Sequence, residues 1–158
     1  MQSKVKTLNA KHVLIVEDDP DLRQIFTEVL EHHGYTVSEA ATGQEAIVTA
    51  IHKKPKLILL DLSLPDMTGT EAARVLKRNP QTSHIPIVAC SAYFGPEWRD
   101  QALRCGMVGC LQKPVPLKEI EAISWKDNSI DAGRGPICPH SVSKFQLRKD
   151  QILRLSFE

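Results

Sequence analysis

The sequence lacks any apolar run of about 18 residues or more, the length that a helix needs to cross a bilayer. Its first ten residues also lack the apolar stretch of about 7–15 residues that marks a secretory signal. The formal net charge is only +1, which argues against a strongly basic nucleic-acid-binding protein. We therefore expect a cytoplasmic protein that contacts neither a membrane nor nucleic acid directly.

Closely paired cysteines are missing as well. None of the four cysteines forms a C-x-x-C pair, and a zinc site would need closer pairing with histidines at fixed spacing. Three of them lie in or beside apolar runs, which favours buried free thiols in a reducing compartment. The cysteines are Cys90, Cys105, Cys110 and Cys138.

Several motifs of nucleotide-binding proteins and hydrolases are absent. The sequence has no G-x-x-x-x-G-K-[ST], no G-x-G-x-x-G after its first apolar run, and no G-x-S-x-G. An FMN site is disfavoured too, because Glu17, Asp18 and Asp19 would repel a phosphate at the end of that run. These absences mean that the usual nucleotide-binding, flavin and serine-hydrolase sites fit this sequence poorly.

The chain divides into one folded domain and two flanking segments. A short basic lead occupies residues 1–10, and we expect the domain to span residues 11–125. Residues 127–139 are rich in glycine and proline, which is typical of a linker or loop. The tail, residues 126–158, is too short for a second domain with its own core. For this tail, disorder and packing on the domain or on a second copy are all open alternatives.

Five short apolar runs alternate with amphipathic stretches in the domain. Four of the runs are almost continuously apolar, as strands buried on both faces of a parallel sheet are. Asp19 and the capping-box pattern from Thr42 to Glu45 indicate helix starts, and Gly34 and Gly106 indicate helix ends. Five strand–helix units in about 115 residues predict a doubly wound α/β fold. The runs are Val13–Val16, Thr36–Val37, Leu57–Leu60, Ile85–Cys90 and Val108–Leu111, and the helices begin near residues 20, 43, 69, 96 and 117.

Polar side chains follow four of the predicted strands. In a doubly wound sheet the carboxyl ends of the strands meet at one edge, where binding sites form. That edge would gather the acids of Glu17–Asp19 and Asp61, with Ser91 and Lys113 nearby. Converging carboxylates repel one another unless a cation neutralises them or one acid stays protonated, and oxygen ligands suit Mg²⁺. A carboxylate nucleophile, a divalent metal, a lysine and a hydroxyl together predict a phosphoryl-accepting site.

Four segments carry these motifs, namely Val13–Pro20, Leu57–Gly69, Ile85–Ala92 and Gly106–Pro114. In this order and at these spacings, they resemble the receiver domains of two-component response regulators. The resemblance covers residues 11–125 and implies a (βα)5 flavodoxin-like fold, with a five-stranded parallel sheet in the order 2-1-3-4-5 and helices on both faces. It implies a signalling phosphoacceptor that catalyses only its own phosphorylation and dephosphorylation, rather than an enzyme.

The resemblance implies a role for each acid. Asp61 corresponds to the phosphoryl acceptor, and Asp18 and Asp61 correspond to direct Mg²⁺ ligands. Glu17 would act on the metal through a water, and the backbone carbonyl of Ser63 would be a further ligand. Asp19, the third acid of its run, is interpreted as the cap of the first helix.

The resemblance also implies a set of switch residues. Ser91 corresponds to the hydroxyl that bonds the phosphoryl group, and Lys113, followed by Pro114 in a cis bond, corresponds to the lysine that pairs with it. Tyr93 either covers the path of the hydrolytic water or only packs on the fourth helix. Cys110 replaces the usual aromatic residue, and a thiol cannot reproduce the in/out exchange of a ring. We therefore expect the readout through the fourth helix, fifth strand and fifth helix to differ here.

By this resemblance the protein accepts a phosphoryl group from a histidine kinase or a histidine phosphotransfer protein and signals to a downstream protein partner. Two alternatives stay open: a phosphorylation-independent interaction module, and a fragment of a larger hybrid kinase or DNA-binding regulator. A homodimer is a further open alternative. Kinase specificity would lie on the first helix and after the fifth strand, where an ordinary solvated face is the competing interpretation. The candidate specificity residues are Arg23, Gln24, Thr27, Glu28 and Pro116.

Overall fold

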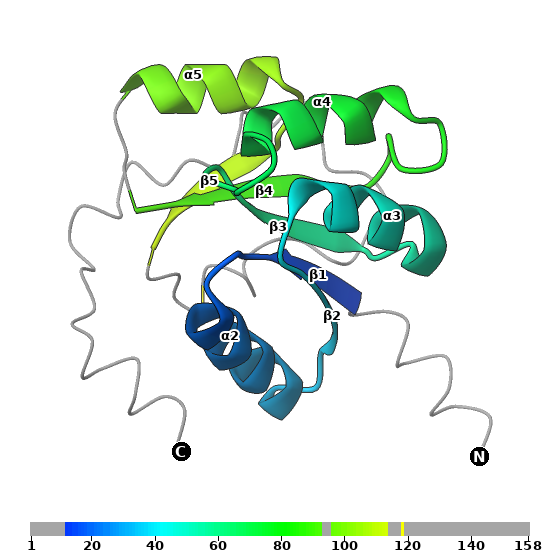
Figure 1. Ribbon diagram of the computed structural model, residues 1–158, viewed down its shortest axis with the longest axis vertical. Coiled ribbons are helices and arrows are strands. Elements are labelled where there is room, and N and C mark those ends of the chain that lie inside the picture. The colour runs from blue at the N-terminus through cyan, green and yellow to red at the C-terminus, as the bar shows by residue number, and fades with distance from the viewer. Residues whose placement is uncertain (1–11, 93–95, 114–117, 119–158) are drawn as a thin grey trace.

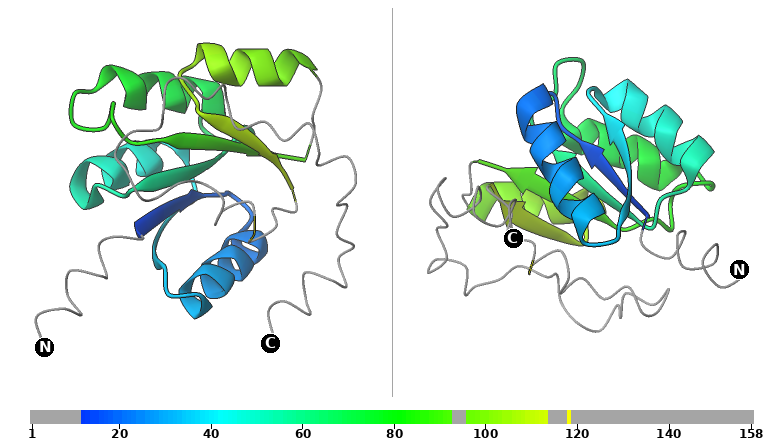
Figure 2. Two further views of the ribbon diagram at one scale, coloured as in Figure 1. Left: turned by 180° about the vertical axis from the view of Figure 1, so that it is seen from behind. Right: turned by 90° about the horizontal axis from the view of Figure 1, so that it is seen from below.

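The computed structural model describes residues 12–92, 96–113 and 118, which contain one sheet with helices on both faces (Figure 1). The strands are β1 (His12–Val16), β2 (Thr36–Ala40), β3 (Leu57–Asp61), β4 (Ile87–Ser91) and β5 (Gly109–Gln112). The helices are α2 (Pro20–His32), α3 (Gly43–Lys53), α4 (Gly69–Arg78) and α5 (Pro96–Arg104). The strands are parallel and stand in the order β2-β1-β3-β4-β5, which confirms the predicted topology. Helix α2 covers one face of the sheet, and α3, α4 and α5 cover the other (Figures 1 and 2).

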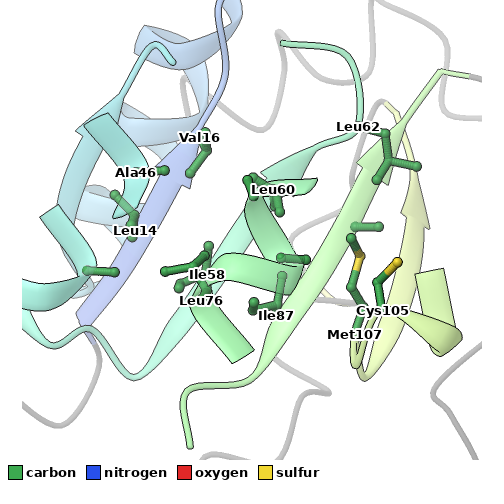
Figure 3. Packing of buried hydrophobic residues seen from close by; sticks show 14 of the residues in the cluster. Leu14, Val16, Ala46, Ile58, Leu60, Leu62, Leu76, Ile87, Cys105 and Met107 are labelled. Carbon is green, nitrogen blue, oxygen red and sulfur yellow. The ribbon is translucent and has the colours of Figure 1, made fainter. Parts of the chain in front are cut away.

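The central strands are apolar on both faces, as the continuous apolar runs predict. Strand β3 is buried along its whole length. Successive residues of a strand point to opposite faces, so Leu60 belongs to the core beneath α3–α5 and Leu59 to the core beneath α2. Figure 3 shows Leu76 of α4 packed beside Ile58 and Ile87 in the first of these cores. The central strands β1, β3 and β4 are accordingly buried except at the first residue of β1 and the last residue of β4.

The edge strand β2 extends further than the sequence predicts. The apolar run Thr36–Val37 continues as a strand to Ala40, although Ser38 and Glu39 are polar. Both side chains have partners: Ser38 hydrogen-bonds a histidine of β1 at 2.8 Å, and Glu39 accepts from the hydroxyl of Thr27 at 2.6 Å. An edge strand is covered less completely than a central strand, so it tolerates polar residues. These polar residues interrupt the apolar run by which a strand is recognised in the sequence.

Two helix starts are capped by threonines. At α3, Thr42 accepts from the N–H of Glu45 at 3.1 Å, as the sequence predicts. The Glu45 carboxylate, however, accepts from the N–H of Ala41 at 2.8 Å, so the return bond lies one residue before the cap. The reciprocal capping box forms instead at α4, between Thr68 and Glu71. This box fixes the end of the loop that follows β3.

The ends of several elements follow glycine and proline. Gly34 and Gly106 have φ values of 87° and 84°, a conformation that glycine adopts without strain, which agrees with their predicted role. Strand β4 begins at Ile87 rather than at Ile85, because Pro86 has no N–H to donate to the sheet. Of the predicted fifth helix only residue 118 is described, and the lead and the tail lie outside the described residues. None of the described helices is long and apolar enough to span a membrane.

Candidate functional site

Three carboxylates meet at the carboxyl edge of the sheet. Glu17 directly follows β1, and Asp61 is the last residue of the neighbouring strand β3. One carboxylate oxygen from each of Glu17, Asp18 and Asp61 lies within 4.8 Å of the others. Glu17 and Asp61 are only 3% and 6% exposed, whereas Asp18 is open to solvent. Two of the three acids are therefore largely withdrawn from water, which is costly unless a cation lies beside them.

Lys113 supplies a cation to this cluster. It follows β5, and its backbone N–H donates to the carbonyl of Ser91 at the end of β4, at 2.8 Å. Its Nζ donates to Asp61 Oδ2 at 2.9 Å and also to the carboxylate of Glu17. A single ammonium group thus contacts both buried acids, of which one directly follows β1 and the other ends β3.

Burial and pairing shift the proton affinities of Glu17 and Lys113. Burial raises the pKa of Glu17, and the hydrogen bond and charge of Lys113 offset this only in part. Burial alone would lower the pKa of Lys113, but its hydrogen bonds to Asp61 and Glu17 and the charges of these two acids together outweigh that effect. The pKa of Lys113 is therefore raised, and the lysine stays a cation at neutral pH.

Asp19 has a structural role in the first helix. Its Oδ1 accepts from the backbone N–H groups of Asp21 and Leu22, at 2.9 and 3.2 Å. Asp19 is therefore the N-cap of α2, as its sequence position predicts. The acidic cluster found among the described residues does not include it.

The loop after Asp61 folds back tightly onto this residue. The backbone N–H of Ser63 donates to Asp61 Oδ1 at 3.0 Å, which holds one carboxylate oxygen in place. Ser63 pairs with Thr68 in an antiparallel bridge, and the N–H of Gly69 donates to the carbonyl of Leu62 at 3.0 Å. A Cβ atom at Gly69 would lie 2.3 Å from the carbonyl oxygen of Asp61, so only glycine fits this position. The orientation of Asp61 therefore depends on the packing of the loop.

The predicted switch residues lie at different depths. Ser91 ends β4 and is half-buried beside the cluster, where its carbonyl accepts from Lys113. Cys110 is 4% exposed and belongs to the core beneath α3–α5, away from solvent. It contributes a small apolar side chain to that core and presents no ring at the surface. The predicted switch residues outside the described residues are Tyr93 and Pro114.

Residues proposed for kinase specificity lie on α2 and have partners within the protein. The guanidinium of Arg23 donates from Nη1 to the backbone carbonyl of Glu17 at 2.7 Å. It thus ties the helix to the end of β1. Gln24 donates to the carboxylate of Glu28 at 2.9 Å, on the exposed side of the helix. Pro116, the candidate beyond β5, lies outside the described residues.

Sequence reasoning missed one neighbour of the cluster, Cys90. It lies opposite Asp61 in the register of β3 and β4, and it lines a small pocket that Lys113 and Phe26 also line. Burial raises the pKa of its thiol to about 12, so the group stays protonated at neutral pH and is a poor nucleophile. Its place directly before Ser91 in an apolar run was the available signal. We assign Cys90 to the packing of the site.

The donor set fits a hard divalent cation. All three clustered groups are carboxylates, the ligands that Mg²⁺ prefers, and exposed Asp18 leaves room for water in the coordination shell. Lys113 offsets one of the three negative charges, so a divalent cation would complete the neutralisation. An acidic cluster of this composition is therefore suited to magnesium.

Lys113→Ala should destabilise the protein, because it leaves Glu17 and Asp61 buried without a cation. Breaking a buried ion pair costs about 3–5 kcal/mol, and we expect the lower end of that range since the cluster is open to water at Asp18. Mg²⁺ should then stabilise the variant more than the wild type, because it replaces the missing charge. Thermal unfolding with and without Mg²⁺ measures both effects, with Lys56→Ala, at an exposed lysine, as the control. An equal response of all three proteins to Mg²⁺ would contradict this account.

Comparison with known proteins identifies the family. Residues 13–124 match the response regulator receiver domain. The phosphate regulon transcriptional regulatory protein PhoB of Pseudomonas aeruginosa is 38% identical over 112 residues, which cover 71% of this chain and 49% of that protein. The polar-differentiation response regulator DivK of Brucella anthropi is 34% identical over 108 residues, which cover 66% of this chain and 85% of DivK. The solved structure of the chemotaxis protein CheY4 of Vibrio cholerae has a TM-score of 0.69 at 30% identity, covering 72% of this chain and 98% of that chain.

The matches differ in how much of each relative they cover. The chain spans about half the length of PhoB but most of DivK and nearly all of CheY4. The matched segment contains the sheet apart from His12, together with the three acids and Lys113. Fold, site geometry and sequence therefore agree, and the chain belongs to the response regulator receiver domain family of two-component systems.

Proposed function

We propose that this protein accepts a phosphoryl group on Asp61 from the phosphohistidine of a histidine kinase or a histidine phosphotransfer protein. The observation that carries the proposal is the contact between Asp61 Oδ2 and Lys113 Nζ, at 2.9 Å, within a cluster of two further carboxylates. Phosphoryl transfer develops negative charge on the acceptor and on the transferring group, and a fixed lysine beside a metal site stabilises that charge.

The acceptor is oriented before the reaction. Oδ1 of Asp61 accepts from the N–H of Ser63, and Oδ2 accepts from Lys113. In the transfer, one Asp61 oxygen forms a bond to phosphorus as the bond from phosphorus to the donor histidine breaks, and the electron pair of that bond returns to the histidine nitrogen. Lys113 lies close enough to pair first with the Asp61 carboxylate and then with the oxygens of the new phosphoryl group.

The chain's own residues suit a magnesium ion at this position. Asp18 and Asp61 would hold it directly, Glu17 would act through a water, and the backbone carbonyl of Ser63 would be a further ligand. When bound, Mg²⁺ offsets the negative charge of the transferring group. The Ser63 N–H and Lys113 would remain responsible for orienting Asp61.

Signalling would follow from a change at Ser91, whose hydroxyl would bond the phosphoryl group and alter the surface offered to a protein partner. Cys110 is buried in the core and has no ring to exchange between two positions, so this readout would not use the usual aromatic switch. A second copy of the chain is the alternative partner. The buried free thiols of Cys90 and Cys105 suit a reducing compartment, and we propose the cytoplasm.

The proposal is tested by incubating the protein with acetyl phosphate and Mg²⁺ and measuring its intact mass. We expect a gain of one phosphoryl group per chain that hydroxylamine removes, because hydroxylamine cleaves an acyl phosphate but not a phosphoserine or phosphothreonine ester. Omitting Mg²⁺ should suppress the gain. No mass gain, or a hydroxylamine-resistant gain, would refute Asp61 as the acceptor.

A further inference from the structure

The tip of the loop after Asp61 is bonded to the start of α3. The carboxylate of Asp66 accepts from the N–H of Gly43 at Oδ1 (2.8 Å) and from the N–H of Gln44 at Oδ2 (2.9 Å). N–H groups in the first turn of a helix have no partner within the helix, and a negative charge there is favourable. These two hydrogen bonds lower the pKa of Asp66. Asp66 thus holds α3 with both of its oxygens.

An apolar contact reinforces this attachment. Met67 packs against the backbone of Gly43 so closely that a Cβ atom there would lie 2.4 Å from Met67 Cγ and 2.6 Å from Sδ. Met67 is also packed against the core beneath α3–α5. Two consecutive loop residues therefore contact the start of α3, Asp66 through hydrogen bonds and Met67 through packing. We call Asp66, Met67 and Gly43 the loop clamp.

The base of the same loop contacts the acceptor. Ser63 pairs with Thr68 in a bridge that closes the loop, and the Ser63 N–H donates to Asp61. The capping box of Thr68 with Glu71 joins the loop to α4. The loop around Ser63 is therefore attached at two places. Thr68 joins it to α4, and the loop clamp joins it to α3. Loss of the clamp would remove one of the two attachments that hold the loop around Ser63.

We propose that Asp66 is a positioning residue that sets the direction of the Ser63 backbone carbonyl, and thereby the affinity of the site for Mg²⁺. This inference rests on the proposed magnesium site. Asp66 bonds α3 rather than the acidic cluster, so it acts only through the loop of residues 63–68. Groups that orient metal ligands from outside the coordination shell commonly change metal affinity by about 10–100-fold.

The test is a Mg²⁺ titration of ¹⁵N-labelled protein, followed through the amide signals of the loop. In Asp66→Ala we expect the Mg²⁺ dissociation constant to rise by about tenfold, the lower end of that range. Hydrogen exchange at Gly43 and Gln44 should accelerate, which reports the loss of the clamp itself. Asp66→Asn keeps one acceptor oxygen and should give an intermediate affinity.

Glu45→Ala is the matched control. It removes a carboxylate from the first turn of the same helix, where Glu45 accepts from Ala41, without touching the loop. A merely structural role of Asp66 would lower stability in both variants and leave the Mg²⁺ affinity of both unchanged, and that result would overturn the inference. If the wild type bound no Mg²⁺, the proposed function would fail instead, so the two failures are distinguishable.

Discussion

Asp61→Asn should eliminate phosphorylation. Asparagine has nearly the same shape, and its oxygen can still accept from the N–H of Ser63. It lacks the anionic nucleophile, however, and its amide would turn N–H donors toward Lys113, where Asp61 now accepts a hydrogen bond. We expect the rate to fall by at least about 1000-fold, which corresponds to roughly 4 kcal/mol of barrier.

Intact mass after exposure to acetyl phosphate and Mg²⁺ measures this loss. Asp21→Asn is the matched control, because it makes the same chemical change at an exposed acid in the first turn of α2. That variant should gain the phosphoryl group at the wild-type rate. Thermal unfolding of all three proteins shows whether each is folded. A folded Asp61→Asn protein that still gained the group at the normal rate would mean that another residue is the acceptor.

The central strands could be predicted because both of their faces are apolar, which gives continuous apolar runs in the sequence. Leu57–Leu60 is apolar at every position, since helices cover both faces of β3. Strand β2 shows the limit of such patterns. Its Ser38 and Glu39 interrupt the apolar run, yet they fit an edge strand because each has a hydrogen-bond partner at the half-covered edge.

The place of the site could be predicted for a geometric reason. Parallel strands end at a common edge, so acids that follow β1 and β3 must approach one another whatever the details of packing. The partners of Lys113 could not be predicted from spacing alone. Its two acceptors, Glu17 and Asp61, lie 96 and 52 positions earlier in the chain, and which of them it contacts depends on side-chain geometry.

The contacts of Asp66 could not be predicted from the sequence for a related reason. Its motif suggests only an exposed acid in a turn, and its partners Gly43 and Gln44 lie 23 and 22 positions earlier. Nothing local in the sequence marks the contact, because it depends on how α3 is placed against the loop. Residue patterns thus placed Asp61 and its immediate neighbours at one edge of the sheet, whereas the structure was needed to identify what holds the loop after Asp61.

Two neighbouring acids, Asp18 and Asp19, offer a sharp test of the proposed metal site. Asp18 belongs to the acidic cluster and is exposed, while Asp19 caps α2. Asp19→Ala should therefore lower stability by about 1 kcal/mol through loss of the cap, and it should leave Mg²⁺-dependent phosphorylation intact. Asp18→Ala should show the opposite pattern, since it removes a proposed ligand and no capping bond.

In detail, Asp18→Ala should reduce phosphorylation from acetyl phosphate by at least about 100-fold, because a metal ion contributes several kcal/mol of charge stabilisation to such transfers. The metal-free variant should be slightly more stable than the wild type, since one of three mutually repelling carboxylates is gone. Thermal unfolding should no longer respond to Mg²⁺. Rates and unfolding curves for both variants, with and without Mg²⁺, decide the matter. Equal losses of phosphorylation in Asp18→Ala and Asp19→Ala would show that helix α2, rather than a ligand at Asp18, supports the reaction.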